Sequence, residues 1–510
     1  MFGRQFFLAI LLVSAGLTTL AQKIVYSDYA KNDTRSMDFE IAGKINGNFL
    51  IYKNNRSNNH VISVLDDEMK EISVAEQDYL PSTDKIINVD FFPYNDFCYL
   101  IYQYQKKNVV YCMAAKIDGN GKKIGELQEL DTTHLGFAVN NKIYTVLTSE
   151  DKSKIIVFKI NSRNKRLFGI TTNLLNDRLD LLKKSYFQVA MDDRNENLTD
   201  FQLDNEGDLV FSKFYRNSND IISKASMMIK HAQADSLREN VLNIEQTLLD
   251  EIHIKVDNPN KRYILISYYF KERRGNIEGF YFYVWDKTLQ NPSMENATVF
   301  SEELRREAKG EASVKMAFND YFIRNIITRK DGGFIIGSES YYTTSRFNNW
   351  NRWDYLYGSP YMNSYNNNYY SPYYNNYWWG SRVNSNQAVR YHADNIAVLS
   401  FNNKGEQEWY SVMTKSQFDD QSDDLVSYQL VNTGGQIHFL FNLQERRNNL
   451  LTDYTLTPAG QLSRNPTLKN LDKGYEFMPK YGKQVSSRQM IIPCLYRNYI
   501  CFAKVDYTQN

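Results

Sequence analysis

The residue types that carry most protein chemistry occur in this sequence, but not at the spacing that such chemistry needs. Six histidines are spread over 510 residues, and none belongs to an H-E-x-x-H, H-x-H or C-x-x-C arrangement. The sequence also lacks a G-x-S-x-G nucleophile turn and a glycine-rich phosphate loop. We therefore predict no catalytic residue, no metal site and no cofactor.

Neighbouring carboxylates are the remaining catalytic candidates, because a pair of them can act as acid and base on a glycosidic bond. Acidic runs occur at 66–68, 192–193, 302–303, 419–420 and 423–424. All of them fall in segments that we predict to be turns or linkers, where a solvated charge is the ordinary outcome. A carbohydrate-active or glycan-binding protein that uses carboxylates in a central channel stays as the alternative function.

The four cysteines are too few for a disulfide framework and lack the spacing of zinc ligands. "CLYRNYIC" centres a two-residue turn on Arg497-Asn498, which sets Cys494 opposite Cys501. A second hairpin could set Cys98 opposite Cys112 in the same way. Directly opposed strand residues lie within disulfide range, so we predict two candidate bridges, with buried free thiols as the other outcome.

A tract rich in Tyr, Trp, Asn and Ser is the most unusual stretch of the chain. The segment 347–379 holds four of the six tryptophans, and its only charged residues are Arg352 and Asp354. Tyr and Trp offer rigid amphipathic surface at low entropic cost, as in protein recognition loops. The predicted partner-binding residues are Trp350, Trp353, Tyr369, Tyr370, Tyr373, Tyr374, Tyr377, Trp378 and Trp379.

Three interpretations of this tract stay open: a contact loop, a low-complexity segment with no defined ligand, and a cover that plugs the protein's own face. Within the first, the length of the tract favours a protein partner over one sugar ring, although glycan binding belongs with it. Nucleic acid is not expected, because the tract has no Lys and the chain has a net charge of only +1.

The elements that must position these residues are short strands in a repeat. Apolar runs follow turn residues at 47–52, 95–102, 140–147, 207–214, 261–269, 332–340, 435–442 and 487–496. Most are followed by a second strand-like run after a polar loop. Repeats of this length, with several short strands each, predict an all-β fold, a β-propeller of seven or eight four-stranded blades.

The turns after the second runs repeat as well. In "IDGNGK" from Ile117, "FNNKGE" from Phe401 and "LTPAGQ" from Leu456, an Asp, Asn or Thr opens the turn and a Gly follows three residues later. A hairpin loop built on a type I turn needs a left-handed residue at that place. The last repeat is short of one strand, and "KIVYSDY" (23–29) could supply it and close the ring.

Helix is sparse in this pattern. The segment 301–312 begins with a capping Ser and continues with helix-forming residues, so we predict a short helix there. The segment 175–187 is a second helix candidate, and an outer strand with its connecting loop is the other interpretation of both segments.

On repeat spacing and turn type, the chain resembles the exported β-propeller repeat proteins of bacterial cell envelopes. The resemblance covers roughly 23–509 and includes no WD-dipeptide or kelch-type motif. It implies a protein without an assigned activity. The Tyr/Asn/Trp-rich insertion, 341–392, would lie in one hairpin loop of the propeller domain, 22–510.

The first residues predict export. Arg4 precedes the apolar run Phe6–Leu17, and "TLA" ending at Ala21 suits cleavage, which gives a signal peptide over 1–21. No later stretch is long and apolar enough to span a bilayer. We expect a non-enzymatic binding or scaffolding module of the periplasm or outer membrane, with display at the cell surface as a further alternative.

Overall fold

The structure is a computed structural model, and it describes most of the chain after the predicted signal peptide. The described residues are 23–55, 59–83, 85–136, 142–162, 166–192, 195–216, 221–244, 247–273, 275–345, 352, 356, 369–370, 389–420, 422–445, 448–465 and 474–508. The predicted signal peptide, 1–21, lies outside them.

The strands form antiparallel units of four, which we call blades and number along the chain. Each of the first three blades takes its strands in simple chain order. Blade 1 contains β2 (Asp38–Ile45), β3 (Asn48–Asn55), β4 (Asn59–Leu65) and β5 (Glu71–Glu76). Blade 2 contains β6 (Ile86–Pro93), β7 (Cys98–Lys106), β8 (Val109–Ile117) and β9 (Lys123–His134). Blade 3 contains β10 (Tyr144–Thr148), β11 (Lys154–Ser162), β12 (Leu167–Asn176) and β13 (Leu181–Ala190).

Blades 4 and 5 together make one eight-stranded sheet. Blade 4 contains β14 (Glu196–Leu203), β15 (Leu209–Arg216), β16 (Ile222–Lys230) and β17 (Leu237–Val241). Blade 5 contains β18 (Leu248–Asp257), β19 (Arg262–Phe270), β20 (Gly279–Asp286) and β21 (Asn291–Val299). Among the described residues, the two halves pair at one position only, Ile222 opposite Leu249. The seven hydrogen-bonded sheets of the described residues therefore comprise eight four-stranded units.

The remaining blades carry small additions. Blade 6 contains β22 (Tyr321–Thr328), β23 (Phe334–Ser345), β25 (Val389–Phe401) and β26 (Gln407–Met413), with β27 (Gln417–Asp419) also on β25. Blade 7 contains β28 (Tyr428–Asn432), β29 (Ile437–Glu445), β30 (Asn448–Leu456) and β31 (Leu462–Arg464). Blade 8 contains β34 (Gln489–Tyr496) and β35 (Tyr499–Asp506), with β32 (Tyr475–Phe477) and β33 (Lys483–Ser486) on one edge of β34.

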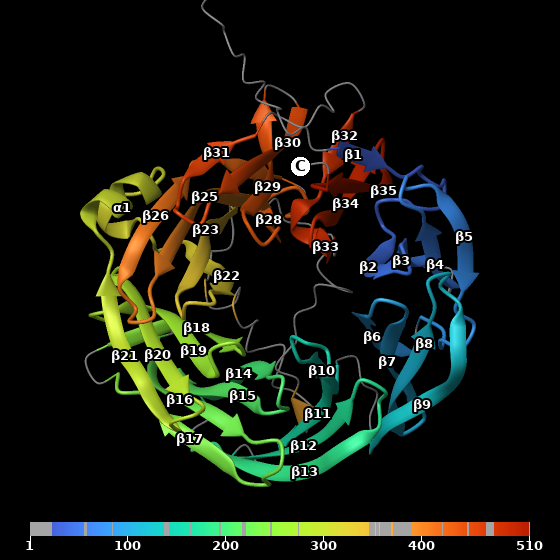
Figure 1. Ribbon diagram of the computed structural model, residues 1–510, viewed down its shortest axis with the longest axis horizontal. Helices are drawn as coiled ribbons and strands as arrows, with labels where there is room; N and C mark the ends of the chain where they lie inside the picture. The colour runs from blue at the N-terminus through green and yellow to red at the C-terminus, as the bar shows by residue number, and fades with distance from the viewer. Residues whose placement is uncertain are drawn as a thin grey trace, which may run out of the picture.

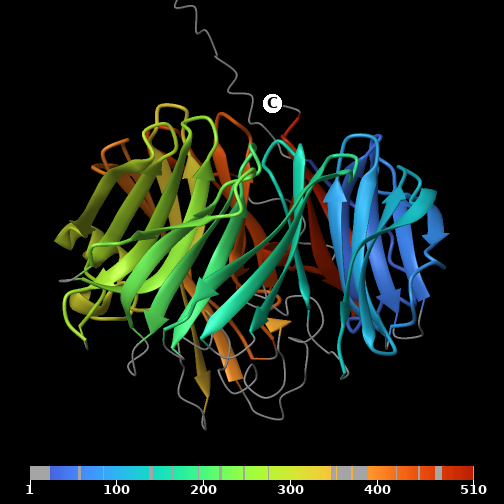
Figure 2. The same cartoon turned by 90° about the horizontal axis from the view of Figure 1, so that it is seen from below.

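The blades stand side by side in a ring, with the first strand of each of blades 1 to 7 toward the centre (Figure 1). Their strands run between the two faces of the ring (Figure 2). The N-terminal strand β1 (Lys23–Tyr26) pairs with β35, from Lys23 opposite Asp506 to Tyr26 opposite Ala503. This confirms the predicted closure, in which the first strand completes the last blade and covers the free edge of β35.

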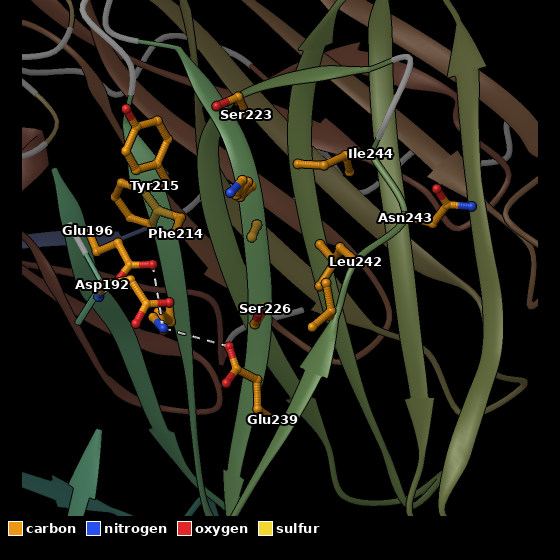
Figure 3. A pocket seen from close by; sticks show the side chains of 14 residues that line it. Asp192, Glu196, Phe214, Tyr215, Ser223, Ser226, Glu239, Leu242, Asn243 and Ile244 are labelled. Carbon is orange, nitrogen blue, oxygen red and sulfur yellow. Dashed lines mark hydrogen bonds and ion pairs between the residues drawn. The ribbon is translucent and has the colours of Figure 1, made fainter. Parts of the chain in front are cut away.

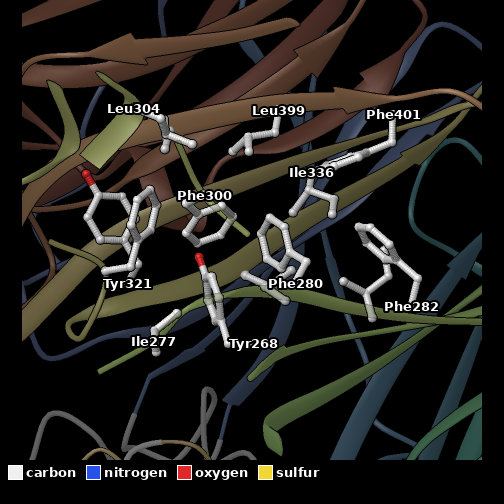
Figure 4. Close-up of a cluster of buried hydrophobic side chains, with 14 of the residues drawn as sticks. Tyr268, Ile277, Phe280, Phe282, Phe300, Leu304, Tyr321, Ile336, Leu399 and Phe401 are labelled. Atoms are coloured by element: carbon white, nitrogen blue, oxygen red, sulfur yellow. The ribbon is translucent and has the colours of Figure 1, made fainter. Parts of the chain in front are cut away.

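Apolar side chains fill each interface between neighbouring blades, which explains why the ring is stable. One cluster joins blades 8 and 1, so the series is closed around the circle. The cluster between blades 5 and 6 is rich in aromatic rings, including Phe280, Phe282 and Phe401 (Figure 4). Each blade would expose its apolar faces if it stood alone, and stacking removes them from water at about 25 cal/mol per Å².

The repeated turns have the predicted geometry. Gly121, Gly405 and Gly460 have φ values of +71°, +75° and +79°. The first residue closes the turn through its side chain: Asp118 Oδ1 accepts hydrogen bonds from the backbone N–H groups of Asn120 and Lys122, both at 2.9 Å. Such a turn needs a small acceptor at its start and a left-handed residue near its end.

Helices are short, as predicted. Helix α1 spans Glu302–Ala308, and Ser301 Oγ caps it by accepting from Leu304 N at 3.2 Å. Single 3₁₀ turns occur at η1 (Val314–Met316) and η2 (Pro479–Tyr481). The helix considered over 175–187 is instead the end of β12, a turn and the start of β13, which was the other interpretation.

Candidate functional site

The predicted insertion lies between β23 and β25, which form the longest hairpin among the described residues. Strands β23 and β25 pair beyond the ring as far as Ser345 opposite Val389. Phe322, Tyr341, Ala393 and Val426 form a buried apolar cluster at its base, and Leu356 from the insertion packs against it. The insertion is therefore attached to blade 6 by its flanking strands and by a side chain of its own.

Arg352 makes a second attachment, to blade 5. Its Nε donates to Asp250 Oδ2 at 2.8 Å, and one Nη lies 3.4 Å from Glu251 Oε1. Both carboxylates belong to β18, the innermost strand of blade 5, and both are buried. The charges of Asp250 and Glu251 hold the pKa of Arg352 above its usual range, although burial alone would lower it.

A third attachment reaches the opposite part of the ring. Strand β24 (Tyr369–Tyr370) pairs with β11 of blade 3, with Tyr370 opposite Ile160 and Tyr369 opposite Asn161. These two positions follow directly on Lys159, where the pairing of β10 with β11 ends. The insertion thus adds a short strand to a free stretch of sheet edge, in the manner of strand addition by a peptide.

The described residues include only part of the predicted contact set. Tyr369 and Tyr370 form β24, as stated above. Trp350, Trp353, Tyr373, Tyr374, Tyr377, Trp378 and Trp379 lie outside the described residues.

Of the two predicted strand pairings that would set one cysteine opposite another, the structure confirms one and contradicts the other. Arg497 and Asn498 form the predicted two-residue turn, with φ values of +56° and +103°. Cys494 therefore stands opposite Cys501, with free thiols whose sulfurs are 3.2 Å apart. A bond between them stays a prediction.

The predicted pairing of Cys98 with Cys112 is wrong. The turn between β7 and β8 is centred two to three residues later than we assumed, so Cys98 faces Ile117 and Cys112 faces Gln103. Cys98 packs between blades 1 and 2, whereas Cys112 packs between blades 2 and 3. The two thiols point to opposite faces of the same sheet and cannot form a bridge.

A buried charge network lies beside the insertion, between blades 6 and 7. Glu339 is fully buried, and Lys415 Nζ lies 2.9 Å from its Oε1. Lys415 also donates to Ala393 O at 2.8 Å and to Gln417 Oε1 at 2.7 Å. Burial lowers the pKa of Lys415, whereas the charge of Glu339 opposes this shift.

His253 extends the acidic cluster of β18. Its Nε2 lies 2.9 Å from Glu251 Oε2. Burial alone would lower the pKa of His253, but the hydrogen bond and charge of Glu251, with the charge of Asp200, outweigh it, so the pKa is raised. Among the described residues near the insertion, each buried carboxylate named here thus has a cationic neighbour.

A separate pocket of about 960 Å³ lies at one end of blade 4, where the chain leaves β17 (Figure 3). The amine of Lys213 is buried between Glu196 and Glu239, at 3.5 and 3.9 Å. Leu242 and Ile244 contribute apolar wall, and Tyr215 and Ser223 lie at the far end. Because the single ammonium of Lys213 is shared as an ion-pair partner by both carboxylates, they are poorly placed to act as a free acid and base.

The described part of the chain has neither of two further kinds of site, a metal centre or a membrane-spanning helix. No group of three or more His, Cys, Asp or Glu side chains there could hold a metal ion. None of the helices in those residues has the length and apolarity needed to cross a membrane.

Comparisons with known proteins assign no family to the chain. No protein-family model matches it, and no curated protein is similar to it in sequence. The WD40 domain of SCAP from fission yeast matches with a TM-score of 0.40 and 8% identity, over 95% of this chain and 98% of that one. The β-propeller domain of the Trilobed protease from Pyrococcus furiosus matches with a TM-score of 0.37 and 10% identity, over 83% and 93%.

Prolyl oligopeptidase B from Galerina marginata is similar at a TM-score of 0.41 and 8% identity, over 91% of this chain and 56% of that one. The chain is a β-propeller. That assignment follows from the strand pairing and the closed ring of interfaces, and similarities this distant carry no information about activity.

The anchoring residues were missed by sequence reasoning, although a signal existed. Arg352 is one of two charges in a long uncharged tract, and "DE" at 250–251 interrupts an apolar strand. Isolated charges in otherwise uncharged or apolar surroundings are usually paired when the chain folds. The two signals are about a hundred residues apart, so the sequence gives no reason to join them.

Proposed function

We propose that this protein is a non-enzymatic binding or scaffolding module of the cell envelope, and that its Tyr/Asn/Trp-rich insertion contacts a protein partner. The observation that carries the proposal is the attachment of the insertion at three places: blade 6 through β23 and β25, blade 5 through Arg352, and blade 3 through β24. An aromatic segment fixed to a rigid body loses less entropy on binding than a free tail, so it makes a better contact surface.

The composition of the insertion supports a protein as the partner. Trp and Tyr are the residue types most often found at the energetic centres of protein interfaces, and Asn and Ser supply adaptable hydrogen bonds. The ion pairs of Asp250, Glu251 and Glu339 support the non-enzymatic part, because these carboxylates balance buried cations. Export to the periplasm or outer membrane rests on the signal-like sequence 1–21 alone.

A block substitution tests the contact surface without shortening the chain. A deletion would shorten the connection between β24 and β25 and could disrupt their pairing with the ring. Five aromatic residues are therefore replaced by Ser instead: Tyr373, Tyr374, Tyr377, Trp378 and Trp379. The matched control replaces five exposed residues on outer strands by Ser: Ile72, Val74, Leu181, Leu182 and Tyr186. Both variants should melt as the parent does, because neither set includes a described core residue.

The readout is affinity capture from native membranes, followed by mass spectrometry. We expect a protein that the parent and the control both retain and that the aromatic block loses. Equal recovery by all three forms would count against the insertion as contact surface. If the aromatic block instead abolishes retention on glycan columns while protein capture is unchanged, the glycan alternative replaces the protein partner.

A further inference from the structure

The Arg352 side chain lies in a pocket whose walls belong entirely to the ring. Asp250 and Glu251 come from blade 5, Phe322 comes from blade 6, and Tyr268 comes from β19 of blade 5. We call these four residues the guanidinium pocket. All four are buried: their exposed fractions are 6%, 1%, 1% and 0%.

The contacts of Arg352 use both features that distinguish a guanidinium from other cations. Its Nε and one Nη both reach Asp250 Oδ2, at 2.8 and 2.7 Å, and that same Nη approaches Glu251 Oε1. Its planar group also lies over the ring of Phe322, with 3.8 Å from Cζ to the ring centre. A lysine ammonium has neither the fork nor the flat face, so it would satisfy these walls poorly.

The walls are held in place by contacts that do not involve Arg352. Glu251 Oε1 accepts from Ile323 N at 2.8 Å, and its other oxygen contacts His253. Phe322 is shared with the apolar cluster at the insertion base, and Tyr268 stacks on Phe280 in the core between blades 5 and 6. The pocket should therefore keep its shape when the arginine is removed.

Charge makes the pocket a strong site for a cation. Two carboxylates are buried side by side, and removing one partner of a buried ion pair leaves an uncompensated charge. Burial raises the pKa of Asp250, which shows how poorly solvated that group is, and Arg352 opposes the shift. Without Arg352, the pocket should bind a ligand that places a planar cation where the guanidinium of Arg352 lies.

We propose that the guanidinium pocket is a ligand site for alkylguanidines, arginine side chains included, which Arg352 occupies as an intramolecular ligand. The inference goes beyond the proposed function and does not depend on it. A tethered arginine competes at an effective concentration on the order of millimolar, so the parent chain should not take up added ligand. Removal of Arg352 should expose the site.

The test uses the full-length Arg352→Ala variant and titration calorimetry with agmatine, an alkylguanidine. We expect one site per chain and a rise in melting temperature as agmatine is added. 1,4-Diaminobutane, which has the same double positive charge as agmatine but no fork, should bind at least tenfold more weakly. Adding Glu251→Gln to the Arg352→Ala background should weaken agmatine at least tenfold, because it removes one of the two buried charges.

Arg390→Ala is the matched control, because Arg390 also pairs with a carboxylate and lies over an aromatic ring, but at the surface. It should bind no agmatine, and neither should the parent. The proposal is overturned if Arg352→Ala binds no agmatine, if it binds 1,4-diaminobutane equally well, or if Arg390→Ala binds agmatine equally well. Should Arg352→Ala not fold alone, recovery on refolding with agmatine but not with 1,4-diaminobutane supports the site, and failure with both overturns it.

Discussion

Two arginines of this molecule make nearly the same contacts in opposite surroundings. Arg390 donates to both oxygens of Asp420, at 2.6 and 2.9 Å, and lies 4.6 Å over the ring of Phe418. Arg352 contacts Asp250 at 2.7 Å and lies 3.8 Å over Phe322. The side chains of the first pair are 46% and 59% exposed, whereas those of the second are 15% and 8% exposed.

Contact distances alone therefore do not tell which of the two ion pairs contributes more to the free energy of unfolding. Water solvates both partners of the Arg390 pair when the pair breaks, so little free energy is lost. Neither partner of the Arg352 pair can be solvated unless the insertion moves away from blade 5. We infer that the buried pair of Arg352 and Asp250 holds the insertion in place. The exposed pair of Arg390 and Asp420 forms near the end of the β23–β25 hairpin and contributes little to holding it there.

Removing the buried guanidinium should have the largest effect. Arg352→Ala leaves Asp250 and Glu251 buried without their cation, and breaking such a pair costs about 3–5 kcal/mol. The free energy of unfolding from urea titration at low salt measures this loss. A loss below about 1 kcal/mol would mean that the buried pair behaves like a surface pair, and the comparison would fail.

Neutralising one wall of the pocket should have an intermediate effect. Glu251→Gln keeps the shape of the side chain, but it places an amide where Glu251 accepts from Ile323 N and contacts His253. A mismatched buried hydrogen bond costs about 1–3 kcal/mol. The same urea titration checks this value, and an unchanged free energy of unfolding would show that Glu251 carries no charge important to the pocket.

His253 should make the buried site sensitive to pH. Its folded pKa is raised by Glu251 and Asp200 against burial and against the charge of Arg324, so protonation stabilises the folded state. This stabilisation is complete below the unfolded pKa of about 6.5 and is lost as pH rises through the folded value. The melting temperature difference between the parent and His253→Gln should therefore be largest near pH 5.5 and shrink toward pH 8.5. A difference that grows with pH would contradict the assigned charge.

The exposed pair should give the smallest effect. Arg390→Ala is expected to leave the melting temperature unchanged within error, and any residual difference should vanish in high salt because exposed charges are screened. Melting curves at low and high ionic strength test this. A decrease in melting temperature that is independent of salt and comparable to that of Arg352→Ala would contradict this prediction. It would mean that the exposed pair constrains the hairpin end as strongly as the buried pair constrains the insertion.

The fold could be predicted from sequence because its signals are local. Strands that are buried on both faces, such as Tyr263–Ile266 in β19, give continuous apolar runs, and most of the predicted first runs coincide with the second strand of a blade. The run at 140–147 is instead the innermost strand of blade 3. Outer strands such as β13 alternate buried and exposed residues and border long turns, so one of them was open to interpretation as helix.

The candidate site was only partly predictable. The aromatic composition of the insertion marks it as unusual, and its place between two strands follows from repeat spacing. Its attachment does not, because Arg352 meets Asp250 through contacts between segments about a hundred residues apart, and β24 meets β11 across the ring. Likewise, a shift of the β7–β8 turn by a few residues was enough to turn Cys112 away from Cys98.

A double-mutant cycle on Arg352 and Asp250 tests the central claim, that a buried ion pair fixes the insertion to the ring. The four proteins are the parent, Arg352→Ala, Asp250→Ala and the double variant, and the readout is the free energy of unfolding. We predict a coupling of about 2 kcal/mol or more, in the range of close, desolvated charge pairs. The parallel cycle on Arg390 and Asp420 should give none that can be measured. Equal coupling energies in the two cycles would contradict the account.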